Sequence, residues 1–216
     1  MPDFPRIMVW AWERPEKLDF LNPNEAGVAF LASTIHVHGD LVTARPRLQP
    51  LVTAPGAALM AVVRVESQDP EPSARVETEH AIIEATRFPG VRALQVDYDA
   101  KVSERDFYLG LLADLRRVLP PAMPLSITAL ASWCQYDDWI AELPVTEAVP
   151  MLFRMGAEPY RSGEDFRPLL CRSSVGISTD EPLAKPPSGR RVYIFHPRSW
   201  SEGELHAAIR EVRRWQ

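Results

Sequence analysis

Long apolar runs, glycine-rich phosphate motifs and blocks of basic residues are all absent from this 216-residue sequence. No stretch approaches the ~20 apolar residues of a membrane span, and no signal peptide opens the chain. The net charge is -5 with both signs spread along the chain, which argues against a nucleic-acid or anionic-membrane partner. We expect no membrane span, no cofactor and no nucleic acid. The compartment stays open, since a leader or lipid anchor could have been trimmed from a longer gene product, as in periplasmic or envelope proteins.

Cysteine is scarce, and two copies do not make a disulfide framework. Cys134 follows an apolar strand-like run, whereas Cys171 precedes another. If those strands are parallel, the two thiols lie at opposite ends of the sheet, too far apart to bridge. No histidine lies near either thiol in sequence, which argues against a nucleophilic role. The sequence therefore predicts two unpaired cysteines.

Proline is abundant, with 21 residues against a usual share of ~5%, and it punctuates the ends of elements. Eight strand-like runs are near-continuously apolar, which is typical of parallel strands that are covered on both sides. They span residues 6–12, 27–34, 59–66, 91–98, 125–133, 148–155, 173–178 and 191–195. Helical patterns occupy 72–87, 103–119 and 201–215, with a short one at 137–142.

Eight strands with intervening helices predict a single domain over residues 1–216, a compact (β/α)8-type barrel. Some helices are expected to be shortened or missing, because 156–170 and 180–190 are rich in proline, glycine and charge. Residues 33–51 have no helical period and predict a β-hairpin turning at Gly39-Asp40, in place of the second helix. An open doubly wound sheet is the alternative, but neither G-x-G-x-x-G nor G-x-x-x-x-G-K-[ST] occurs.

Acids, arginines and tryptophans follow the predicted strands, whereas plainer residues precede them. Active sites of such barrels lie at the carboxyl ends of the strands. We therefore expect a cleft there with carboxylates for proton transfer, arginines for anionic groups and flat aromatic rings. The candidate catalytic residues are Asp97, Asp99, Asp180 and Glu13. The candidate substrate-binding residues are Glu66, Arg64, Trp133, Arg154, His196 and Trp200.

Each candidate also has a structural interpretation. Asp97 could be held by Arg64 or Arg154 in a buried ion pair, and Asp99 could cap the following loop. The tryptophans could belong to the core or the rim. His36 and His38 are spaced for two ligands of one metal ion, but they fall on the expected exposed hairpin without a third ligand nearby, so no metal is predicted.

Several segments carry a resemblance to a known family: MVWAWERPE, GVAFLAST, RPRLQPL, AVVRVES, VRALQVDYDAKVSERDFY, PLSITALASWC and EAVPMLFRMG. Over about residues 7–156 they resemble an uncharacterised bacterial family of unknown function with a glycoside-hydrolase-like fold. The resemblance implies a barrel and no established activity.

The ending Asp97-x-Asp99 is similar, more distantly, to the Asp-x-Asp-x-Glu of chitinase-like barrels. Lys101 stands where that pattern has its acid, so a chitinase-type mechanism is not carried over, and Glu104 is expected to complement the helix dipole. In another glycosidase layout, acids follow the fourth and seventh strands, which Asp99 and Asp180 (or Glu181) fit loosely.

Two functions are carried forward. The first is a carbohydrate-active hydrolase of a bacterial glycan that acts on a polysaccharide or oligosaccharide. The second is a non-catalytic glycan-binding or cell-envelope scaffold protein. An open cleft with an unneutralised carboxylate favours the first, and acids consumed by arginines favour the second.

Overall fold

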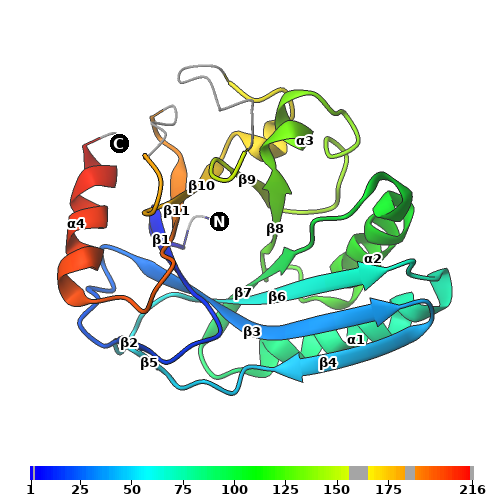
Figure 1. Ribbon diagram of the computed structural model, residues 1–216, viewed down its shortest axis with the longest axis horizontal. Coiled ribbons are helices and arrows are strands. Elements are labelled where there is room, and N and C mark those ends of the chain that lie inside the picture. The colour runs from blue at the N-terminus through cyan, green and yellow to red at the C-terminus, as the bar shows by residue number, and fades with distance from the viewer. Residues whose placement is uncertain (2, 156–164, 183–187, 215–216) are drawn as a thin grey trace.

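The computed structural model describes residues 1, 3–155, 165–182 and 188–214, and within them eight parallel strands close into a barrel (Figure 1). The strands run around the barrel in chain order: β1 (Ile7–Ala11), β3 (Gly27–His38), β6 (Leu59–Gln68), β7 (Val91–Asp97), β8 (Leu125–Leu130), β9 (Glu147–Met151), β10 (Ser174–Ser178) and β11 (Arg191–Phe195). β1 pairs with both β3 and β11, and so closes the ring. The predicted (β/α)8-type barrel is confirmed.

Continuous apolar strands arise here because both strand faces are buried. In β1, Met8 and Trp10 belong to an inner cluster, whereas Ile7 and Val9 belong to the outer core beneath the helices. Gly176 lets these large inner side chains meet. A Cβ atom at that position would lie 2.8 Å from the Met151 sulfur and 3.0 Å from the Trp10 ring.

The helical layer is incomplete, as expected from the proline-rich linkers. The α-helices are α1 (Arg75–Glu84), α2 (Arg105–Val118), α3 (Ala131–Gln135) and α4 (Glu202–Arg213). Short 3-10 turns are η1 (Pro72–Ala74), η2 (Ala85–Arg87), η3 (Val102–Glu104) and η4 (Leu169–Cys171). A small parallel pair, β2 (Glu16–Leu18) with β5 (Leu51–Thr53), lies outside the barrel. Only the connections after β6, β7 and β11 carry helices of ten residues or more among the described residues.

The predicted hairpin replaces the helix after the second barrel strand. β3 continues to His38, turns at Gly39-Asp40 and returns as β4 (Leu41–Pro46). Gly39 has a φ of 58°, in the left-handed region that glycine adopts readily. We call residues 33–46 and 63–68 the wing. It extends past the barrel, with α1 along one face (Figure 1) and its opposite face open.

Two local predictions were wrong. The fifth strand stops at Leu130 instead of 133, and the chain turns at once into α3, so Trp133 is helical. No helix forms at 137–142, where the chain makes consecutive turns. The short helix lies one segment earlier because the buried residues of 131–135 recur at a helical spacing against the outside of β8 and β9.

The prediction of unpaired cysteines was also wrong. Cys134 and Cys171 form a buried disulfide with Cα atoms 6.0 Å apart. α3 and η4 both pack on the outside of β9, and the Arg167 amide donates to the Cys134 carbonyl (3.1 Å). The chain therefore returns to α3 before it enters β10. For this reason the parallel direction of the strands does not place the two sulfur atoms at opposite ends of the sheet.

A hydrogen-bonded chain of polar side chains crosses the barrel interior. The Trp10 indole donates to Gln95 (3.0 Å), Gln95 donates to Ser126 (3.0 Å), and Ser126 donates to Glu147 (3.2 Å). Arg191 forms an ion pair with Glu147 (3.1 Å), and the Tyr193 hydroxyl donates to the same carboxylate (2.5 Å). The burial of these groups raises the pKa of Tyr193 well above its ordinary value. This network of polar side chains links five strands beneath the mouth of the barrel.

Candidate functional site

A cavity of about 370 Å³ opens at the carboxyl ends of the strands; we call it the mouth cleft. It is lined by Trp10, Trp12, Val62, Arg64, Asp97, Asp99, Thr128, Leu130, Met151, Phe153, Arg154 and Phe195. The strands place these side chains together because all eight end at the same rim. The sequence-based expectation of a cleft at this end agrees with this geometry.

Asp97 is the last residue of β7, and its carboxyl group is largely shielded, with 13% of the side chain exposed. The Thr128 hydroxyl donates a hydrogen bond to it (2.7 Å), and an Arg64 nitrogen lies 3.7 Å away. Burial raises the pKa of Asp97, and nearby Asp99 acts in the same direction. The hydrogen bond from Thr128 and the charge of Arg64 offset this only in part. Asp97 is therefore a carboxyl group that keeps its proton to a higher pH than usual.

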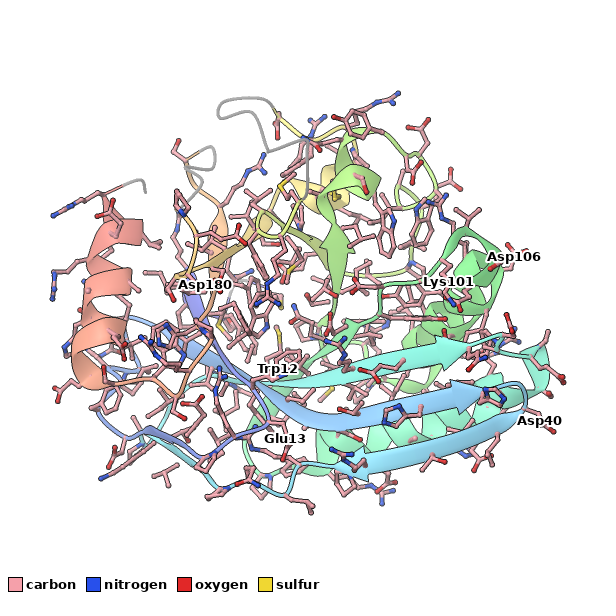
Figure 2. The ribbon with its side chains drawn as sticks, viewed as in Figure 1. Trp12, Glu13, Asp40, Lys101, Asp106 and Asp180 are labelled. Carbon is pink, nitrogen blue, oxygen red and sulfur yellow. A yellow bond between two sulfur atoms is a disulfide. The ribbon has the colours of Figure 1, made fainter. Side chains whose placement is uncertain are left out.

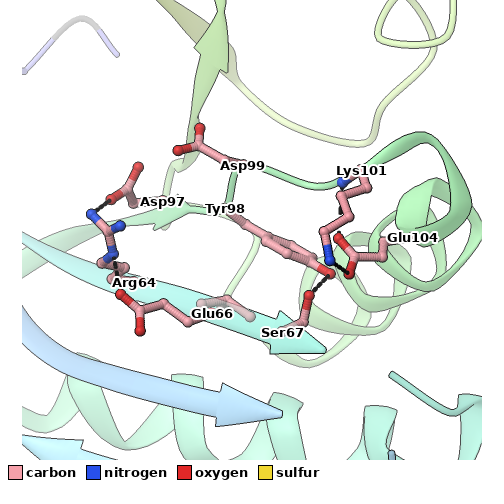
Figure 3. A pocket seen from close by; sticks show the side chains of 9 residues that line it. Arg64, Glu66, Ser67, Asp97, Tyr98, Asp99, Lys101 and Glu104 are labelled. Atoms are coloured by element: carbon pink, nitrogen blue, oxygen red, sulfur yellow. Dashed lines mark hydrogen bonds and ion pairs between the residues drawn. The ribbon is translucent and has the colours of Figure 1, made fainter. Parts of the chain in front are cut away.

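Asp99 follows two residues later, beyond the end of β7, and is exposed. It lines both the mouth cleft and a smaller side pocket of about 190 Å³ (Figure 3). Within the described parts of the chain, its carboxylate makes no hydrogen bond or ion pair. The site thus pairs a shielded carboxyl group at the end of β7 with an open one two residues further along the chain.

The remaining polar groups of the side pocket are engaged with one another (Figure 3). Glu104 accepts from the Lys101 amide (2.8 Å) and lies 3.3 Å from its ammonium nitrogen, so it caps the turn that opens α2. The hydroxyl groups of Tyr98 and Ser67 are hydrogen bonded (2.8 Å), and burial raises the pKa of Tyr98 to about 12. Glu104 therefore caps the start of the helix, and the Lys101 ammonium group pairs with it.

Aromatic rings form the wall of the mouth cleft opposite β7. Phe153 and Phe195 are stacked, with centroids 5.7 Å apart, and Trp12 meets Phe195 edge-on (6.1 Å). Arg154 lies over Phe195 (5.8 Å) and Arg64 lies over Trp12 (5.7 Å). The rings are half-buried, so part of each face is open to a ligand. Sequence reasoning missed both rings, although Phe153 lies two residues beyond β9, Phe195 is the last residue of β11, and each comes directly after a core residue.

The open face of the wing continues the mouth cleft. A cavity of about 330 Å³, the wing pocket, is lined in part by Trp12, Thr34, His36, Arg45 and Glu66. Strand register places Arg45, Thr34, Arg64 and Asp97 in one cross-strand row. Glu66 is held by Arg64 (2.8 Å) and by His36 (3.3 Å).

Two of the candidate acids lie away from the cleft floor. Glu13 accepts from the amides of Leu48 and Gln49 (3.1 and 3.2 Å), so its carboxylate fixes the loop after β4. Asp180 accepts from Ser178 and lies 3.8 Å from Arg154. The hydrogen bond from Ser178 lowers the pKa of Asp180, and Arg154 contributes in the same direction. Figure 2 shows Trp12 between Glu13 and Asp180 in that view.

Three further candidates are buried on the outside of the barrel. Trp133 packs edge-on against Trp139 (4.9 Å). His196 stacks on Trp200 (4.5 Å), and the Trp200 indole donates to the Trp10 carbonyl (3.1 Å). Burial lowers the pKa of His196. The structure therefore brings Asp97, Asp99, Arg64 and Arg154 together in the mouth cleft and Glu66 beside it, but places these three side chains behind it.

Within the described residues, no three or more His, Cys, Asp or Glu side chains gather in a way that could hold a metal ion. No helix in the same part of the chain is long and apolar enough to cross a membrane. Comparisons with family models, curated proteins and solved structures find no match for this chain. What is shown is an eight-stranded parallel β-barrel with few helices, and the family resemblance stays a prediction.

Proposed function

We propose that this protein is a carbohydrate-active hydrolase in which Asp97 is the general acid and Asp99 is the second catalytic carboxyl group. The observation that carries the proposal is the shielded carboxyl group of Asp97, with its raised pKa, beside the unpaired carboxylate of Asp99 in an aromatic-lined cleft. Two carboxyl groups in unlike environments are the pattern by which glycosidases divide acid and base roles.

Each carboxyl group has a distinct step in such a reaction. Protonated Asp97 donates its proton to the glycosidic oxygen as the bond to the leaving sugar breaks. Asp99 either attacks the anomeric carbon or removes a proton from the attacking water. The first role retains the anomeric configuration and the second inverts it, so proton NMR of the first product identifies the role of Asp99.

The shape and chemistry of the groove suit a sugar chain. The mouth cleft shares Trp12 and Arg64 with the wing pocket on one side. On the other side it shares Leu130 and Phe153 with an outer pocket of about 410 Å³. Several sugar units could therefore lie across the acids, with their apolar faces on the half-buried aromatic rings.

The second candidate is a non-catalytic glycan-binding protein. It is favoured by Lys101, which stands where chitinase-like barrels have their acid, by the ion pairs that hold Glu66, and by the hydrogen bond that Asp180 accepts from Ser178. The open carboxylate of Asp99 beside the shielded carboxyl group of Asp97 supports the hydrolase, because a binding protein needs no such pair.

The test is a reducing-end assay on a panel of bacterial cell-wall and exopolysaccharide fragments. The variants are Asp97→Asn and Asp99→Asn, with Asp106→Asn as the matched control, because Asp106 is an exposed acid of α2, away from the cleft (Figure 2). We expect turnover to fall by about 10² to 10⁴ in both cleft variants and to persist in the control. Binding without turnover in the wild-type protein, or full turnover in Asp99→Asn, would contradict the proposal.

A further inference from the structure

We infer that the glycan carries anionic groups, carboxylate or sulfate, and that Arg154 and Arg45 bind them on the two sides of the acids. This inference rests on the proposed function, because it deepens the substrate class of the same groove. The two arginines come from opposite ends of that groove: Arg154 lines the mouth cleft and the outer pocket, and Arg45 lines the wing pocket.

Arg154 is held in place by its backbone. Its φ of 53° lies in the left-handed region, which side chains other than glycine rarely adopt. The Arg154 amide donates to both carboxylate oxygens of Glu181 (3.1 Å each). Such a strained conformation persists only where the surroundings fix it, and it is found most often at ligand sites. The chain therefore directs this residue to the rim of the cleft.

The guanidinium group of Arg154 retains donors for a ligand. The nearest carboxylate oxygen, on Asp180, is 3.8 Å away, which is too far for a hydrogen bond, and Asp180 already accepts from Ser178. The side chain is 65% exposed and lies over the ring of Phe195. A planar guanidinium group in this position can take a carboxylate or sulfate through two parallel hydrogen bonds.

Arg45 offers a second cation across the acids. It lies on the open face of the wing, exposed, in the cross-strand row that continues through Thr34 and Arg64 to Asp97. In the part of the chain that the structure describes, its side chain makes no hydrogen bond or ion pair. Both acids that line the wing pocket are engaged elsewhere: Glu66 with Arg64 and His36, and Glu13 with the amides of Leu48 and Gln49.

The protein has a net charge of -5, yet an arginine with free donors, Arg154 or Arg45, lies on each side of the two acids. A neutral glycan would not require them, because it is recognised through hydroxyl groups and ring faces. A glycan with repeated anionic groups would satisfy both arginines at once while its neutral ring lies on the aromatic wall. The pairing of these two cations with the aromatic wall therefore favours an acidic polysaccharide.

The test uses oligogalacturonate and its methyl ester, which has the same backbone without the charge, and sulfated galactan oligosaccharides with their desulfated forms. Affinities are measured by calorimetry in an Asp99→Asn background, so that hydrolysis does not remove the ligand. The variants are Arg45→Ala, Arg154→Ala and Arg154→Lys. Arg87→Ala is the matched control, since Arg87 is an exposed arginine paired with Glu84 at the end of α1, outside the groove.

We expect the charged form of at least one pair to bind about tenfold tighter than its neutral form, and more weakly as salt is raised. Arg45→Ala and Arg154→Ala should each remove most of that difference, Arg154→Lys only part of it, and Arg87→Ala none. The preferred pair distinguishes carboxylate from sulfate. Equal affinity for charged and neutral forms, binding of none of them, or loss of preference in Arg87→Ala alone would overturn the inference.

The same reagents separate this inference from the proposed hydrolase. Asp99-dependent hydrolysis of neutral glycans with no preference for charge would overturn the inference and leave the hydrolase standing. Charge-dependent binding with no release of reducing ends by the wild-type protein would overturn the hydrolase and support the anionic ligand.

Discussion

The disulfide between Cys134 and Cys171 gives a prediction of stability. Its residues are 37 positions apart, and opening it releases a loop of that length in the unfolded chain. In the chain-entropy account, closing such a loop stabilises the folded protein by about 4 kcal/mol. For a protein of this size, 1 kcal/mol shifts the melting temperature by about 2 to 4 °C. Loss of the bridge should therefore lower it by about 8 to 16 °C.

The assay compares oxidised protein, protein reduced in denaturant and then refolded, and a Cys134→Ala, Cys171→Ala double variant. Urea unfolding of each gives the free energy of unfolding, and a thiol reagent counts free sulfhydryl groups. Because both cysteines are joined in the disulfide, the reagent should find no free sulfhydryl group in the oxidised protein before or after unfolding. The double variant should melt at the same temperature with and without reductant.

Two results would refute this reasoning. Two free thiols in the unfolded, air-oxidised protein would show that the bridge does not form. An unchanged free energy of unfolding after reduction would show that other contacts already fix α3 and η4 against β9. Only the first result would leave the sequence-based prediction of unpaired cysteines standing; the second would show that the bridge forms but does not stabilise the fold.

Three further predictions concern the barrel interior and the cleft. Asp97→Asn should stabilise the protein at pH 7. The pKa of Asp97 is higher in the folded than in the unfolded state, so the wild-type fold loses stability as pH rises through the folded-state pKa. The stability gained by the variant, measured by urea unfolding, should therefore shrink toward about pH 4. Turnover should fall as pH rises through the same pKa, since only protonated Asp97 donates; a rate that rises there would contradict its role. Glu147→Gln should cost about 3 kcal/mol, because the guanidinium group of Arg191, with only 12% of its side chain exposed, loses its carboxylate partner, whereas Glu84→Gln at an exposed pair should cost under about 1 kcal/mol.

Much of the fold follows from local patterns in the sequence. Apolar runs between proline-rich linkers predicted all eight barrel strands, and the absence of a helical period at 33–51 predicted the hairpin at Gly39-Asp40. Those signals are readable because parallel strands covered on both faces must be apolar throughout, and a wing with one open face must alternate. The position of Asp97 and Asp99 at a strand end also placed them at the rim.

Other features depend on contacts between distant segments. Trp133, His196 and Trp200 follow strands as closely as Trp12 does, yet their rings pack outside the barrel. The direction of a side chain after a strand ends depends on the turn that follows. A shift of one residue along the chain moves a side chain from the inside of the barrel to the outside. Phe153 and Phe195 were missed for the same reason, since their approach to within 5.7 Å joins β9 to β11.

The sequence by itself determined the number, order and direction of the strands, because each strand is specified by its own apolar residues. Tertiary structure alone decided the disulfide, the environments of the acids and the position of Arg154. Cys134 and Cys171 meet only because two turns pack on the same strand. Asp97 differs from Asp99 only because Thr128 and the barrel wall shield it, and Arg154 is fixed by Glu181 from a distant loop. Proton affinity and side-chain direction are properties of surroundings, and the chain assembles those surroundings only when it closes the barrel.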